Sequence, residues 1–87
     1  MARVLVVEDE AGLRSSIVYN LRRAGYQVVA AENGEQALEA WTTEPSDLVL
    51  LDLMLPKVDG LEVCRRLRQL TSVPIVMLTA RVDEVDR

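Results

Sequence analysis

Four oxygen-bearing side chains could carry chemistry in this sequence: Glu8, Asp9, Asp52 and Thr79. Asp52 interrupts the apolar run of residues 48–56, and a carboxylate is both rare in a strand and costly to bury. We therefore expect Asp52 at the carboxyl end of a buried strand, facing solvent. Ligands of open α/β sheets bind at the edge formed by the carboxyl ends of the strands. The other three side chains also follow apolar runs, so we expect them at the same edge.

Three carboxylates that converge without a fixed positive side chain would repel one another and raise each other's pKa. A hard divalent cation resolves this conflict, and Mg²⁺ typically binds one or two carboxylates while it keeps several waters. Beside such an ion, Asp52 could act as a nucleophile toward a phosphoryl donor and form an aspartyl phosphate. The Thr79 hydroxyl could donate a hydrogen bond to a phosphoryl oxygen. Residues 8–10 taken alone could instead form a solvated loop or a helix cap.

Alternating strand-like and helix-like segments must position these residues. Short apolar, β-branched runs predict strands, and apolar residues that recur every three or four positions predict helices. The expected strands are residues 4–7, 27–31, 48–56 and 75–78, and the expected helices are residues 11–24, 33–44 and 60–69. Because crossovers between parallel strands are right-handed, this order predicts a doubly wound parallel α/β sheet with helices on both faces. If the second and third strands lie on either side of the first, the strand order is 2-1-3-4.

The helices are expected to bury one face each. In the first helix the apolar positions Leu13, Ile17 and Leu21 form one stripe, and the arginines, Arg14 among them, fall off it. In the third helix we expect burial of Leu61 and of the apolar positions that follow it, Cys64 and Leu67, or of their neighbours.

The composition excludes other classes of function. With 87 residues, 49% of them hydrophobic and 28% charged, the chain has the proportions of one globular domain. It has no histidine, which rules out a Ser/His/Asp triad, and its single Cys64 cannot form an internal disulfide. A net charge of −4 argues against direct contact with nucleic acid. No apolar run suits a signal peptide or a membrane span, so we expect a cytoplasmic protein.

Three blocks of sequence resemble the receiver domain of bacterial two-component response regulators. They are Glu8-Asp9, the run Asp-Leu-Met-Leu-Pro-Lys-Val-Asp-Gly at residues 52–60, and the run Val-Pro-Ile-Val-Met-Leu-Thr-Ala at residues 73–80. The two later blocks, with residues 61–68 between them, are most similar to the OmpR/PhoB-type subfamily, whose members carry a winged-helix DNA-binding domain downstream. The resemblance covers the whole chain and implies a flavodoxin-like receiver fold.

The resemblance implies a role for each matching residue. Asp52 would accept a phosphoryl group from a sensor histidine kinase or a small acyl phosphate. Together with Asp52, Asp9 would bind Mg²⁺ directly, Glu8 would bind it through water, and the backbone carbonyl of Met54 would be a further ligand. Thr79 would be the switch hydroxyl that moves toward the phosphoryl group.

The neighbouring positions would modulate this chemistry. Ala80 is small and would leave the site open to the donor, whereas the bulky Met54 and Arg81 would slow the loss of the phosphoryl group. The implied function is a phosphoacceptor module that controls a downstream, DNA-binding output. It is not an enzyme, apart from catalysing its own phosphorylation and dephosphorylation.

Receiver domains continue past the position of Arg87 through a fourth helix, a fifth strand and a fifth helix. Residues 1–87 are therefore expected to form an incomplete receiver domain. The fifth strand carries a lysine that pairs with the phosphoacceptor, and Lys57 is not at that position, so the resemblance implies impaired switching. Strand 75–78 would then be an exposed apolar edge, through which the chain self-associates or swaps elements with a second copy.

Two other classes of protein are alternatives to a phosphorylated receiver domain. Haloacid-dehalogenase-like enzymes also use an Asp nucleophile with Mg²⁺, but on the first strand and with a second Asp two residues later, unlike Glu8-Asp9-Glu10. A receiver-like interaction module that is never phosphorylated is the other alternative. The joint presence of Asp9, Asp52 and Thr79 argues against it, and a Mg²⁺ titration would separate the two.

Overall fold

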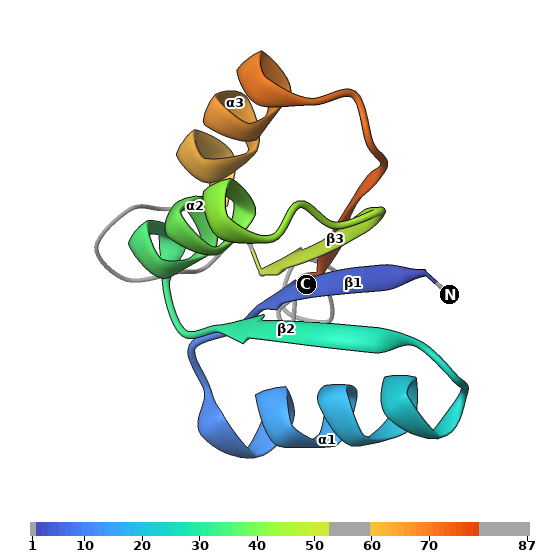
Figure 1. Ribbon diagram of the computed structural model, residues 1–87. Coiled ribbons are helices and arrows are strands. Elements are labelled where there is room, and N and C mark those ends of the chain that lie inside the picture. The colour runs from blue at the N-terminus through green and yellow to red at the C-terminus, as the bar shows by residue number, and fades with distance from the viewer. Residues whose placement is uncertain (1, 53–59, 79–87) are drawn as a thin grey trace, which may run out of the picture.

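Four parallel strands and three helices make up the part of the chain that the computed structural model describes, residues 2–52 and 60–78 (Figure 1). The strands are β1 (Arg3–Val7), β2 (Gln27–Ala31), β3 (Leu48–Asp52) and β4 (Ile75–Leu78), and the helices are α1 (Ala11–Arg23), α2 (Gly34–Thr43) and α3 (Gly60–Leu70). In the described residues no helix is long and apolar enough to cross a membrane.

The strands lie in the order β2-β1-β3-β4, and each neighbouring pair is parallel. This order confirms the predicted doubly wound sheet. In the register between β1 and β3, Val7 is opposite Leu51. The residues that follow them in the chain, Glu8 and Asp52, are therefore brought to the same edge of the sheet.

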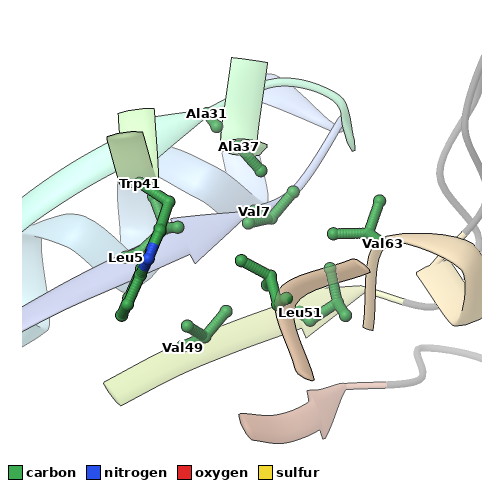
Figure 2. Close-up of a cluster of buried hydrophobic side chains, with 9 residues drawn as sticks. Leu5, Val7, Ala31, Ala37, Trp41, Val49, Leu51 and Val63 are labelled. Atoms are coloured by element: carbon green, nitrogen blue, oxygen red, sulfur yellow. The ribbon is translucent and has the colours of Figure 1, made fainter. Parts of the chain in front are cut away.

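The hydrophobic core fills the space between the sheet and the helices α2 and α3, which lie together on one face, with α1 on the other (Figure 1). Because strand side chains alternate between faces, every second residue of β1 and β3 enters this core. Figure 2 shows the cluster, whose buried members are Leu5, Val7, Ala31, Ala37, Trp41, Val49, Leu51, Val63 and Leu67.

The opposite face of the sheet is covered less completely. Val4 and Val6 are buried there, and α1 packs on β1 and β2. The expected burial of the α1 stripe is wrong for Leu13, which is 39% exposed, and α1 has no fully buried residue. On β4, Val76 faces the same side of the sheet as α1 but is 44% exposed, because α1 packs on β1 and β2.

The phase of α3 also differs from the prediction. Its buried residues are Gly60, Val63 and Leu67, whereas Leu61 is 67% exposed and Cys64 is half-buried against the core. The buried positions are three and four residues apart, which places them on one helix face, and a residue one position after Gly60 is turned away by about 100°. Of the positions named in the prediction, Leu67 is buried and Leu61 is not, and the alternative that their neighbours are buried holds at Gly60 and Val63.

The helix ends follow from local hydrogen bonds. Asn33 caps α2, as its side chain accepts a hydrogen bond from the backbone N–H of Gln36 at 2.9 Å. Glu10 caps α1 by accepting from the N–H of Leu13 at 2.6 Å. Gly25 follows α1 with φ +101°, a left-handed conformation that glycine adopts without steric cost.

Ser46, between α2 and β3, has a buried hydroxyl whose contribution to stability can be tested. The residue is 5% exposed, and its hydroxyl has no hydrogen-bond partner among the described residues. Replacing a buried, unpaired hydroxyl by hydrogen removes a desolvation cost, so Ser46→Ala should raise the free energy of unfolding by about 1 kcal/mol. Urea denaturation would measure it, with Ser72→Ala at an exposed position as the control. A loss of stability in Ser46→Ala would contradict the prediction.

Candidate functional site

Three carboxylates come together at the carboxyl edge of the sheet. One oxygen from each of Glu8, Asp9 and Asp52 lies within 4.8 Å of the other two. Glu8 and Asp9 directly follow β1, and Asp52 is the last residue of β3. The parallel pairing of these two strands brings together residues that are more than forty positions apart in the chain.

Asp52 is not on the solvent side of this edge, so that expectation is wrong. Its side chain is buried, with 3% of the residue exposed. The reason is the position of β3 inside the sheet, where it has β1 on one side and β4 on the other, and Asp52 itself is paired with Leu78. Glu8 is equally buried, whereas Asp9 is exposed. A cation would therefore reach the cluster from the side of Asp9.

Burial changes the acid strength of Glu8. Burial is the largest of the effects that together raise the pKa of the Glu8 carboxyl from its ordinary value of 4.5 to about 7, and the neighbouring carboxylates of Asp52 and Asp9 contribute the smaller part of this rise. The N–H of Glu10, which donates to Glu8 Oε2 at 3.1 Å, acts in the opposite direction. Near neutral pH Glu8 is therefore more readily protonated than an ordinary carboxyl, and a bound cation would displace that proton.

The loop between β1 and α1 is held from both sides. On the strand side, the N–H of Glu8 donates to the carbonyl of Ala31 at 3.0 Å. On the helix side, Arg14 Nη1 donates to the carbonyl of Glu8 at 2.9 Å and makes a longer contact of 3.4 Å with the carbonyl of Asp9. The amino-acid sequence does not predict this contact, because the contact joins a side chain to the backbone and leaves no pattern of residue types.

The donor set fits a hard divalent cation. Carboxylate oxygens are the ligands that Mg²⁺ prefers, and the separations within the cluster allow one ion to touch more than one of them. The other predicted site residues, Met54, Thr79, Ala80 and Arg81, lie outside the described residues, as does Lys57.

The chain is similar to known proteins over almost its whole length. The sequence profile of the response regulator receiver domain matches residues 4–87. This chain belongs to the response regulator receiver family. Among curated relatives, it is 50% identical over 86 residues to the alkaline phosphatase synthesis transcriptional regulatory protein PhoP of Bacillus subtilis, covering 98% of this chain and 36% of PhoP.

A second relative, the transcriptional regulatory protein BaeR of Escherichia coli, is 46% identical over 85 residues, covering 98% of this chain and 35% of BaeR. These relatives confirm the resemblance to OmpR/PhoB-type regulators, and both are named as regulators of transcription. The receiver chain spans about a third of the length of either relative.

Solved structures agree with the fold. The response regulator TrrA of Thermotoga maritima, in complex with Mg²⁺-BeF, has a TM-score of 0.88 and 38% identity, covering 99% of this chain and 76% of that one. TrrA in complex with the histidine kinase ThkA has a TM-score of 0.85 and 41% identity, covering 92% of this chain and 70% of that one. The predicted flavodoxin-like fold is thereby confirmed.

The raised pKa of Glu8 predicts that the metal-free protein loses stability as the pH rises. Glu8 keeps its proton up to a pKa of about 7 in the folded state but only to its ordinary value of 4.5 in the unfolded chain. Folding therefore binds a proton between these values, so its stabilising contribution is complete below the unfolded pKa and is lost as the pH rises through the folded pKa. The loss should be on the order of 2 kcal/mol after allowance for solvent screening.

Urea denaturation in EDTA across this pH range would measure the effect. Glu8→Gln should remove most of the slope, while Glu39→Gln, at an exposed position on α2, should keep it. Saturating Mg²⁺ should restore stability at the alkaline end, because it binds the folded state. A wild-type stability that is flat or rises with pH would show that Glu8 is ionised in the folded state.

Proposed function

We propose that this chain is the phosphoacceptor module of a two-component response regulator. Asp52 takes a phosphoryl group from a sensor histidine kinase, with Mg²⁺ held by Glu8, Asp9 and Asp52. The observation that carries the proposal is the meeting of these three carboxylates within 4.8 Å, at one sheet edge, in a chain of the receiver family. The complex of the relative TrrA with a histidine kinase supports this class of partner.

Asp52, Asp9 and Glu8 would each have a different role in phosphoryl transfer. An Asp52 oxygen attacks phosphorus, and the new P–O bond forms as the P–N bond of a phosphohistidine breaks and the imidazole departs. Burial of Asp52 keeps water away from this nucleophile, and the exposed Asp9 leaves a path for the hydrated ion. When bound, Mg²⁺ supplies the positive charge that neutralises the phosphoryl oxygens. Glu8 contributes a further negative charge once its proton has left.

The remaining parts of the proposal follow the family motif. The Thr79 hydroxyl acts as the switch, Ala80 leaves room for the donor, the carbonyl of Met54 completes the ion's ligands, and Arg81 slows hydrolysis of the aspartyl phosphate. Catalysis is limited to the chain's own phosphorylation and dephosphorylation. The protein acts in the cytoplasm.

The relatives named as transcriptional regulators support an output through DNA, made by a part of the protein other than residues 1–87. The match of almost the whole chain to about three quarters of the TrrA chain supports the interpretation of these residues as part of a receiver domain. The net charge of −4 agrees with the absence of direct DNA contact by this part.

Intact mass after incubation with acetyl phosphate and Mg²⁺ tests the central step. The wild-type chain should gain one phosphoryl group, and Asp52→Asn should gain none, because an amide is not a nucleophile toward phosphorus. Asp47→Asn is the matched control, since Asp47 lies before β3 and its carboxylate accepts a hydrogen bond from the N–H of Arg3. It should be labelled like the wild type.

Two results would contradict this proposal. Labelling that persists in Asp52→Asn would place the acceptor elsewhere. A wild-type chain that binds Mg²⁺ but gains no mass would favour a receiver-like module that is not phosphorylated in this form.

We also propose that this 87-residue chain self-associates through β4. In the described residues β4 is an edge strand, and its Val76 and Met77 are 44% and 37% exposed. An exposed apolar edge presents unpaired backbone groups to a second chain. Light scattering should therefore show dimers or larger species, which Val76→Lys shifts toward the monomer because a charge on an edge strand opposes pairing.

The control for this shift is Leu61→Lys, at a position that is 67% exposed on α3 and away from the sheet edge. It should leave the size distribution unchanged. A monodisperse wild-type monomer with the full helical signal in circular dichroism would refute self-association.

A further inference from the structure

Arg14 connects α1 to the loop that carries two of the three carboxylates. Its Nη1 donates to the carbonyl of Glu8 at 2.9 Å and contacts the carbonyl of Asp9 at 3.4 Å. The side chain is only 18% exposed, although it belongs to a helix with no fully buried residue. Its Nη2 lies 3.9 Å from a carboxylate oxygen of Glu32, on the loop between β2 and α2. The guanidinium is thus held between two loops at the carboxyl edge of the sheet.

The backbone under Glu8 and Asp9 is the stretch that determines where their carboxylates point. Strand pairing of β1 ends at Val7, and α1 begins at Ala11. The N–H of Glu8 is anchored on Ala31, so its strand side is fixed by the sheet. On the side of α1, Arg14 donates hydrogen bonds to the backbone carbonyls of Glu8 and Asp9. Hydrogen bonds from a charged donor are stronger than those between neutral groups.

We propose that Arg14 is a positioning residue for cation binding, which fixes the Glu8–Asp9 backbone before the ion arrives. This inference rests on the proposed function, because it assigns a role toward the Mg²⁺ of that site. Arg14 touches neither the ion nor the phosphoryl group. It acts by ordering the backbone of Glu8 and Asp9, the two residues of this loop that hold the ion, so the ion does not have to order them on binding.

The planar guanidinium suits this role better than an ammonium group. It presents several N–H donors in a fixed geometry, so one side chain can reach two successive carbonyls and the neighbouring Glu32 together. Lysine keeps the charge but not this geometry. A comparison of the two residues therefore separates positioning from simple charge compensation of the acidic cluster.

Calorimetric titration of the 87-residue chain with Mg²⁺, without any phosphoryl donor, tests the proposal. Arg14→Met should weaken Mg²⁺ binding about 10-fold. This value is the lower end of the loss of metal affinity that usually follows removal of a group that orients metal ligands. Arg14→Lys should recover only part of the loss. The matched control is Arg22→Met, which removes the same charge from the same helix, two turns from Arg14. It should bind Mg²⁺ like the wild type.

Three results would overturn the proposal: wild-type affinity in Arg14→Met, full recovery in Arg14→Lys, or equal weakening in Arg22→Met. The last two would assign the effect to charge alone.

Urea denaturation in EDTA gives the folded fraction of each variant. If Arg14→Met does not fold, Arg14→Lys, which keeps the charge and the long side chain, takes its place in the titration. A wild-type chain that binds no Mg²⁺ would refute the proposed function itself, whereas equal binding by wild type and variants refutes only the role of Arg14.

Discussion

Mutual repulsion among three carboxylates is the constraint on which the site depends. Glu8, Asp9 and Asp52 approach within 4.8 Å, and two of them are buried, so both Coulomb repulsion and desolvation oppose the arrangement. The pairing of β1 with β3 imposes it all the same, because the register is fixed by the apolar side chains that these strands send into the core. The free energy that holds the acids together comes from hydrophobic burial elsewhere in the sheet.

The sequence was sufficient for the architecture because its signals are periodic. Apolar β-branched runs and helical spacing define the strands and helices, and the handedness of the crossovers then leaves few strand orders. It was insufficient for finer placement. In α3, Leu61 and Val63 are both apolar, so composition cannot set the helix phase, and packing against the core chose Val63. Asp52 was expected in solvent because a buried carboxylate is costly, yet β3 is enclosed by a strand on each side.

The candidate site was likewise only partly predictable from the sequence. The acidic residues could be identified from residue type and from their place after apolar runs, whereas Arg14 could not, because its contacts are with backbone carbonyls that every residue possesses. The two faces of the sheet also differ in a way that no sequence pattern shows. Leu51 is fully buried beneath α2 and α3, while Leu13 and Val76, on the side of α1, remain partly exposed.

The electrostatic repulsion among the three carboxylates also gives the cluster its affinity for a cation, because a bound cation removes that repulsion. Without an ion, Glu8 can retain a proton near neutral pH, because burial and, to a smaller extent, the carboxylates of Asp52 and Asp9 raise its pKa to about 7. A divalent cation relieves the same repulsion more completely, but it must displace that proton, so metal binding becomes coupled to pH close to neutrality. Burial sets the strength of this coupling, since a solvated Glu8 would be ionised already and would release no proton. The enclosed position of β1 and β3 in the sheet therefore determines how the site exchanges a proton for an ion.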